Sequence, residues 1–278
     1  MTGNPEAALL PDGRLHLHHG PIDLIVTVEG VGRDAGFARA TARFETVLAE
    51  LVAELDHLTL PYDAAIFGGA VAKRMARAVA PLAGDGFVTP MAAVAGSVAD
   101  EVLAVMRDRG LTKVIVNNGG DIAFHLGDGA VFRAASPTGP VEVSADAPVR
   151  GLATSGWRGR SQSFGIADAV TVLARSAAEA DVAATLIANR VDLPGHPAIS
   201  RRPADEVEAI PQLGTMPVTA DVGPLSAQDI ATALDTGQRY AEDLLDRGLI
   251  EGATLLLDQQ TRVIGSSDTA TGLPADQS

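Results

Sequence analysis

Apolar positions along the chain follow two periods, and each period predicts one kind of element. Over 35–58 they recur every three to four residues, which is typical of a helix with one buried face. Further helices are expected over 69–80, 91–109, 176–190 and 226–247. The first half of the 91–109 helix is almost entirely small residues, which allows close packing of another helix or close approach of a ligand.

Shorter apolar segments, bounded by Gly, Asn and Asp, predict strands. They are 22–29, 113–117, 122–126, 131–134, 141–143, 149–153, 169–174, 253–258 and 261–265. This mixture predicts an α+β fold with antiparallel sheets and packed helices, which could contain two similar halves. We expect one domain over 21–265, preceded by an N-terminal extension (1–20) and followed by a disordered tail (266–278).

The segment 193–224 is rich in Pro, Gly and charged residues and is expected to be irregular. A loop of this length exceeds the usual connection between elements. It therefore favours a lid or an interface segment over a passive link.

Composition excludes several classes of protein. The 278 residues carry a formal net charge of −14, which argues against partners such as nucleic acid or an anionic membrane surface. The absence of cysteine excludes disulfides, thiolate zinc sites and iron–sulfur clusters. No export signal and no apolar run of membrane-spanning length is recognised, so a cytoplasmic protein is expected.

The helix expected at 176–190 carries candidate chemistry. Ser176 and Glu179 form a capping-box pattern. Asp181 and Thr185 are then one turn apart on the same face, near a helix start whose free amides favour anions. A carboxylate and a hydroxyl so placed could hold Mg²⁺ and, through it, a phosphate. Alternatively, Thr185 bonds only its own backbone and Asp181 only complements the helix dipole.

Four segments in order resemble one protein family. They are 90–100 (Pro-Met-Ala-Ala-Val-Ala-Gly-Ser-Val-Ala-Asp), 117–121 (Asn-Asn-Gly-Gly-Asp), 151–156 (Gly-Leu-Ala-Thr-Ser-Gly) and 176–185. Together they resemble the ApbE superfamily, whose founding members are flavin transferases. The closer resemblance is to an uncharacterised bacterial and archaeal branch that also shows Ser-Phe-Gly-Ile-Ala-Asp-Ala-Val, here at 163–170.

The resemblance implies an ApbE-like fold, FAD and Mg²⁺ as cofactors, and a small anionic ligand such as a flavin nucleotide. It implies a metal site made by Asp181, Thr185 and the backbone carbonyl near Ala92. The cofactor pocket that it implies is lined by Asn118, Gly119, Gly120, Asp121, Thr154 and Ser155.

Two further groups of residues are candidates in their own right. Arg158 and Arg160 could clamp a phosphate or carboxylate beside the implied pocket, or be solvated on a loop. His16, His18 and His19 could place two imidazoles on one strand face for a metal. The plainer interpretation of the histidines is an exposed edge segment.

The chain departs from the transferases at two motifs. Their Lys-Gly-Tyr run is Ala95-Gly96-Ser97 here, and their His-Ile-Ile-Asp-Pro loop is replaced by 164–168, which has neither the His nor the Pro. One hypothesis is a Mg²⁺-dependent enzyme that transfers FMN or cleaves FAD. The alternative is a non-catalytic cofactor-binding or delivery protein. A homodimer is the default assembly.

Overall fold

A computed structural model describes residues 3–108, 110–207 and 213–265, so the tail expected at 266–278 lies outside the described residues. The chain divides into two compact units. The first unit is 1–133, 142–153 and 174–182, and the rest of the chain is the second. Helix α5 (Ala177–Arg190) and strand β8 (Gly151–Ser155) each contribute residues to both.

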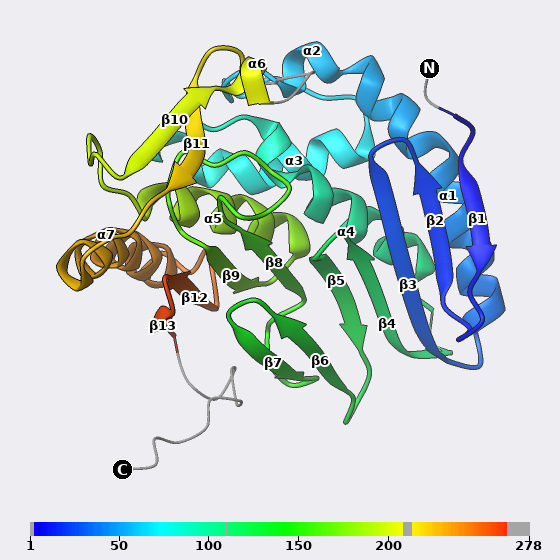
Figure 1. The fold of residues 1–278 in the computed structure, drawn as a ribbon. Helices are drawn as coiled ribbons and strands as arrows, with labels where there is room; N and C mark the ends of the chain where they lie inside the picture. Colours follow the sequence, from blue (N-terminus) through cyan, green and yellow to red (C-terminus); the bar gives the residue numbers. More distant parts are fainter. Residues whose placement is uncertain (1–2, 109, 208–212, 266–278) are drawn as a thin grey trace. The chain divides into compact units, whose positions relative to one another are not determined.

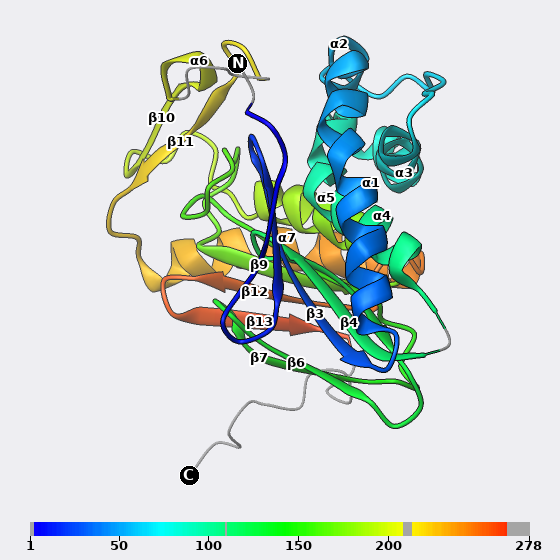
Figure 2. The ribbon, with the colours of Figure 1, turned by 90° about the vertical axis from the view of Figure 1, so that its right-hand side faces the viewer.

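The first unit is built on an antiparallel sheet in the order β1-β2-β3-β4-β5-β8 (Figure 1). Strands β3 and β4 run side by side in Figure 2. Besides β8, the strands are β1 (Glu6–Leu9), β2 (Leu15–His19), β3 (Ile22–Gly30), β4 (Leu111–Asn118) and β5 (Asp121–Leu126). Leu15 and Leu17 of β2 and Leu24 and Val26 of β3 are buried on alternate positions, as a sheet with one covered face requires. The expected N-terminal extension thus contributes two of these strands.

Helices of the first unit pack on this sheet and on one another. They are α1 (Arg33–Ala53), α2 (Leu55–Leu58), α3 (Ala70–Val79), the 3₁₀ segments η1 (Ala80–Asp85) and η2 (Pro90–Ala93), and α4 (Val94–Met106). Helix α4 packs on β4 and β5, while α3 packs on both α4 and η2. The stripe expected on the first long helix is buried, including Phe37, Phe44 and Val47.

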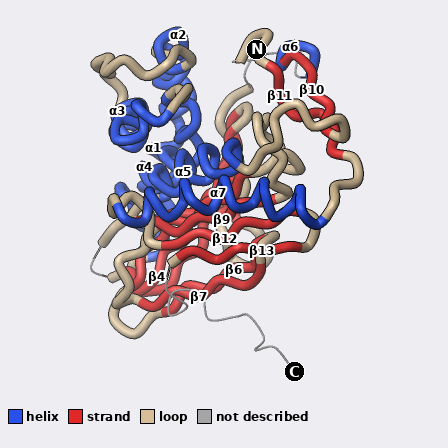
Figure 3. The backbone as a smooth tube through the Cα atoms, turned by 90° about the vertical axis from the view of Figure 1, so that its left-hand side faces the viewer, coloured by secondary structure: helices blue, strands red, loops and turns tan. Residues whose placement is uncertain are grey.

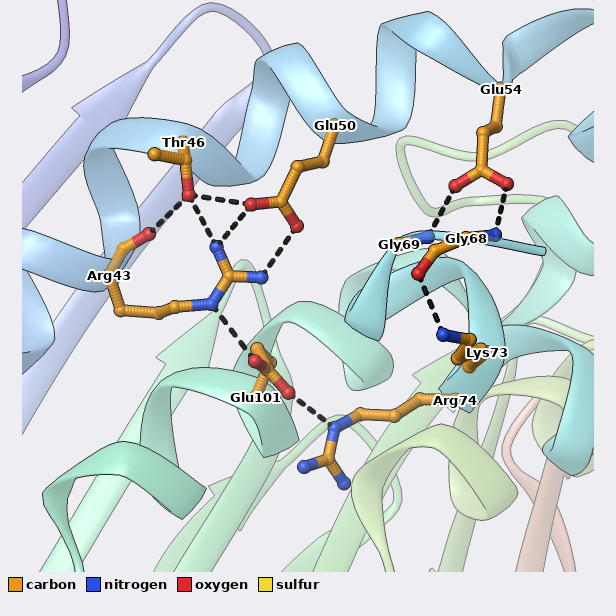
Figure 4. Close-up of polar contacts among 9 residues, drawn as sticks. All are labelled: Arg43, Thr46, Glu50, Glu54, Gly68, Gly69, Lys73, Arg74 and Glu101. Carbon is orange, nitrogen blue, oxygen red and sulfur yellow. Dashed lines mark hydrogen bonds and ion pairs between the residues drawn. The ribbon is translucent and has the colours of Figure 1, made fainter.

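Two expected helices differ from those observed. The helix expected at 35–58 is interrupted at Glu54, whose carboxylate accepts the N–H groups of Gly68 and Gly69 over 2.8 and 2.7 Å (Figure 4). The helix expected at 91–109 is shorter, because it begins with a 3₁₀ turn at Pro90 and ends where Arg107 turns extended, at φ −55° and ψ 122°.

The second unit contains an antiparallel sheet in the order β9-β12-β13, formed by β9 (Ala169–Ala174), β12 (Gly252–Leu257) and β13 (Gln260–Ile264). Helix α7 (Ala227–Asp246) packs against β12 and β13 (Figure 3). Ser226 and Asp229 form a complete capping box at its start. Strands β6 (Val131–Ser136) and β7 (Gly139–Ser144) form a separate hairpin.

The described parts of 193–224, which are 193–207 and 213–224, contain regular elements, contrary to expectation. Strands β10 (Ile199–Pro203) and β11 (Pro217–Val222) pair antiparallel, with the short helix α6 (Ala204–Val207) after β10. These strands escape sequence analysis because most of their residues are polar or half-exposed. A half-buried arginine ties β10 to its surroundings: the Arg201 guanidinium donates to the Phe164 carbonyl and, over 2.5 Å, to Asp192.

Among the described residues, no single helix is long and apolar enough to cross a membrane. Two consecutive helical segments, Ala70–Asp85 and Pro90–Met106, together have the length and apolar composition of a membrane span, but the chain bends by 119° between them. The apolar side chains of this pair, such as Val71, Met75, Val98 and Val102, are buried in the first unit. Antiparallel sheets with packed helices confirm the expected α+β class.

Candidate functional site

Asp181 lies in the first turns of α5, where its carboxylate meets the start of α4. Its Oδ2 accepts the backbone N–H of Gly96 over 2.9 Å. No Lys or Arg of the described chain forms an ion pair with Asp181. The carboxylate is thus fixed by a neutral donor while its charge is uncompensated by any basic side chain.

Two glycines allow α5 to begin at this point. A Cβ on Gly96 would lie 2.2 Å from the carbonyl oxygen of Ala177, and one on Gly151 would lie 2.1 Å from the carbonyl carbon of Ser176. No real Cβ contact is that short, so α4 and β8 touch the helix start backbone to backbone. The small residues noted at the start of α4 therefore serve helix packing.

The first amides of α5 are already bonded. Asp100 accepts the N–H groups of Ala177 and Ala178 over 3.1 and 2.9 Å, and Ser176 Oγ accepts that of Glu179 over 3.2 Å. The predicted Ser176 cap is thus confirmed. The expectation of free amides for an anion is wrong for these three, because a carboxylate from α4 occupies two of them.

Asp121 is brought to the same place by the turn between β4 and β5. Asn118 and Asp121 are paired, and Gly119 and Gly120 between them have φ of +65° and +116°, as a two-residue hairpin turn requires. The Asn118 Nδ2 donates to the Ala95 carbonyl over 3.0 Å. The turn is therefore tied to the segment that binds Asp181.

Three carboxylates share this neighbourhood, and their pKa values reflect it. Burial, followed by the negative charges of Asp121 and Asp100, raises the pKa of Asp181 well above its ordinary value, although the backbone N–H groups oppose the rise. Burial also raises the pKa of Asp100 to about 6, against the hydrogen bonds from Ala178 and Ala177. An additional positive charge would be strongly favoured here.

A hard cation suits these groups better than a transition metal. No group of three or more His, Asp or Glu side chains is placed to hold a metal within 3–108, 110–207 and 213–265. Mg²⁺ does not need such a group, since it is commonly held by one or two carboxylates with water and substrate phosphates. Asp181 and Asp121 fit that chemistry. Ser97 Oγ, fully buried on α4, has no partner among the described residues.

The other predicted site residues are distributed over both units. Ala92 lies in η2 of the first unit, where its N–H donates to the Thr89 carbonyl. Thr185 lies on α5 four residues after Asp181, but among the residues of the second unit. Thr154 and Ser155 end β8 in that unit, and Thr154 Oγ1 is 2.9 Å from Thr171 Oγ1.

The two arginines of the expected anion clamp lie on an exposed turn of the second unit. Arg158 Nε donates to Asp168 Oδ1 over 2.5 Å, and its guanidinium stacks 4.6 Å from the centre of the Trp157 ring. Asp168 Oδ2 in turn accepts the N–H of Asp258. Arg158 is thus already engaged by a carboxylate, and Arg160 is exposed.

The N-terminal histidines divide between the two faces of β2. His16 and His18 share one face, as the alternation predicts, with ring centres 6.3 Å apart. His16 Nε2 is 2.8 Å from Asp23 Oδ1, and His18 is exposed. His19 is buried against the edge of the Phe44 ring, so the interpretation of all three as exposed is wrong for it. The alternation in β2 turns His19 toward the face that carries Leu15 and Leu17.

Comparison with known proteins identifies the family of this chain. The family model described as AbpE bacteria matches residues 7–263. The chain belongs to this family. A UPF0280 protein from Archaeoglobus fulgidus is 40% identical over 129 residues, covering 45% of this chain and 52% of that protein. Another from Methanothrix thermoacetophila is 35% identical over 156 residues, covering 52% and 64%.

The chain therefore matches only about half to two thirds of the length of these archaeal relatives. Among solved structures, the apo flavinyl transferase ApbE of Pseudomonas stutzeri matches with a TM-score of 0.50 and 14% identity, over 96% of this chain and 98% of that one. At that identity the likeness shows the fold. The expected ApbE-like fold is thereby confirmed.

Sequence analysis of this AbpE-family chain missed the residues that organise the site. Asp100 caps α5, and Glu101 beside it is buried between two arginines. The sequence does carry a signal for these two residues, since they are adjacent carboxylates in a helix that has no other charged residue. Such charges are rarely buried without a partner.

Proposed function

We propose that this protein binds a flavin nucleotide through a divalent cation at Asp181. The solved structure that shares the fold is named a flavinyl transferase, and this name suggests a flavin nucleotide as the ligand. The observation that carries the proposal is the Asp181 carboxylate, held beside Asp121 and Asp100 without a basic partner. Mg²⁺ bound there would neutralise this excess charge and polarise a phosphate of the nucleotide.

The residues around the cation have distinct roles in this proposal. Asp181 supplies the anionic ligand, Thr185 a hydroxyl one turn later, and Ala92 a backbone carbonyl. The Gly96 N–H orients the Asp181 carboxylate, so its second oxygen can turn to the metal without loss of that hydrogen bond. Asn118, Gly119, Gly120 and Asp121 would shape the pocket in the first unit.

A binding or delivery role is favoured over FMN transfer by the side chains at the two altered motifs. Ala95 and Ser97 carry no charge where the transferases have a Lys and a Tyr. Asp168 is 16% exposed and bonded to Arg158 and to the Asp258 N–H, so it is fixed within its unit. The Lys and the His of the transferase motifs are missing, and the carboxylate that remains, Asp168, is engaged by Arg158 and the Asp258 N–H.

The first experiment is a thermal unfolding scan with FAD, FMN, ADP and ATP, each with Mg²⁺ and with EDTA. A ligand at 100 times its Kd stabilises the folded protein by about 2.7 kcal/mol. The proposal expects a rise in Tm with FAD and FMN that requires Mg²⁺. Equal Tm with and without flavin would overturn it.

Chemistry is tested separately from binding. The protein is incubated with FAD and Mg²⁺, and the products are separated by chromatography. Recovery of intact FAD is expected for a binding or delivery protein. Release of FMN or AMP, lost in an Asp181→Asn variant, would instead establish the enzymatic alternative.

A further inference from the structure

Arg74 of α3 is held by one edge of its guanidinium, and its other donors remain available. Its Nε donates to Glu101 Oε2 over 2.8 Å (Figure 4). Neither of its terminal nitrogens has a partner among the described residues, and Figure 4 shows both directed away from Glu101. The side chain is 34% exposed, so solvent and ligands reach it.

A buried network fixes the orientation of this arginine. Glu101 lies between Arg74 and Arg43, accepting the Arg43 Nε over 2.9 Å. Arg43 in turn holds Glu50 with both terminal nitrogens, over 2.8 and 2.7 Å. Arg43 and Glu101 are only 15% and 10% exposed. The guanidinium plane of Arg74 is thereby set before any ligand arrives.

Arg74 also lies next to the candidate cation site. Its helix packs against η2, which carries Ala92, and against α4, which carries the Gly96 amide and Asp100. The positive charge of Arg74 acts on the Asp100 carboxyl, and that carboxyl acts on Asp181. A cation with two unused donors thus lies on a helix packed against two segments of the candidate site, close enough for its charge to act on Asp100.

We propose that Arg74 is an anion-binding residue whose two terminal nitrogens grip two oxygens of a phosphate group on the bound nucleotide. The inference rests on the proposed function for the identity of the nucleotide, but the anion site has its own test. A planar fork matches phosphate and carboxylate oxygens alike, and its strength lies in two parallel charged hydrogen bonds. Arg74 therefore supplies a positive charge to a first unit that is otherwise rich in carboxylates at this point.

Isothermal titration with inorganic pyrophosphate and Mg²⁺ tests the site, with malonate as the carboxylate probe. Arg74→Gln is expected to weaken pyrophosphate binding about tenfold or more. Arg74→Lys keeps the positive charge but not the planar pair of donors, so its pyrophosphate affinity should lie between those of Arg74→Gln and the unmodified protein. Arg77→Gln removes the same charge from an exposed position of the same helix and should bind as the unmodified protein does.

Flavins separate this inference from the proposed function. Arg74→Gln should weaken FMN and FAD, while riboflavin, which has no phosphate, should bind both proteins equally. If the unmodified protein binds pyrophosphate through Arg74 but no flavin, the proposed function fails and the anion site stands. If Arg74→Gln binds pyrophosphate and FMN like the unmodified protein, the inference is overturned. Should Arg74→Gln not fold, an undiminished affinity of folded Arg74→Lys overturns it as well.

Discussion

The backbone N–H of Gly96 donates to the Oδ2 of Asp181 over 2.9 Å, joining the start of α4 to the first turns of α5. The same glycine permits the contact of the two helices, because its missing side chain makes room for the Ala177 carbonyl. One residue therefore both positions the carboxylate and sets the helix spacing. A substitution of Gly96 changes the helix spacing but keeps both its backbone N–H and the Asp181 carboxylate.

Gly96→Ala should destabilise the fold strongly. The new Cβ would lie 2.2 Å from the Ala177 carbonyl oxygen, and neither backbone can move without disturbing the Asp100 cap. We expect a loss of about 3 kcal/mol in the free energy of unfolding, measured by urea denaturation. Gly84→Ala, where a Cβ meets nothing within 4 Å, is the control and should change stability little.

Asp181→Asn should raise stability in EDTA while abolishing the response to Mg²⁺. The amide oxygen can still accept the Gly96 N–H, but the charge opposed by burial and by Asp121 is gone. We expect a higher Tm than that of the unmodified protein without metal, and no further rise with FAD and Mg²⁺. Retention of the Mg²⁺-dependent shift would remove Asp181 from the cation site. Glu45→Gln, at an exposed position of α1, is the matched control.

Asp100 should make the protein less stable as the pH rises through 4 to 6. Its pKa is about 6 in the folded protein against 3.8 ordinarily, so the folded state binds the proton more tightly. The stability gained from that proton is complete below pH 4 and is lost as pH rises through 6. Integrated over this interval, the loss is on the order of 3 kcal/mol.

Asp100→Asn, which does not titrate, provides the comparison. The difference in unfolding free energy between the two proteins should shift in favour of the variant between pH 4 and pH 7. Subtraction removes every group that titrates equally in both. A difference that stays constant with pH would mean that the Asp100 carboxyl titrates normally.

Glu101→Gln should destabilise the first unit by about 3 kcal/mol. The substitution leaves the poorly exposed Arg43 and the adjacent Arg74 without a shared counter-charge. Burial opposes the charge of Glu101, but hydrogen bonds from Arg74 and Arg43 outweigh it and lower its pKa. Denaturation with urea measures the loss, and Glu45→Gln should cost far less. Equal costs at the two positions would refute a role for the network in stability.

Much of the architecture follows from periodicity. The buried stripe of α1, the alternation in β3 and the turn at Gly119-Gly120 are each local patterns, and each forms as expected. The β10–β11 pair is not local. It depends on Arg201 reaching the Phe164 carbonyl and Asp192, which no period in 193–224 encodes.

The residues proposed for the site come from sequence motifs, but their arrangement does not. The motifs point to Asp181 and the Asn118–Asp121 turn, and the structure links them through Ala95 and Gly96. The capping of α5 by Asp100 is a contact between residues 77 and 78 apart in sequence. Sequence spacing alone carries no information on such a contact, so the amides were expected to be open.

The contact of Gly96 and Gly151 with the start of α5 also limits how this protein can change. At these two points main chain meets main chain, so no exchange of one side chain for another can adjust the spacing of α4, β8 and α5 by degrees. Under the proposals above, selectivity for one ligand over another would then be adjusted by side chains of neighbouring helices, such as Arg74. A library for altered ligand preference should therefore vary α3 and leave both glycines untouched.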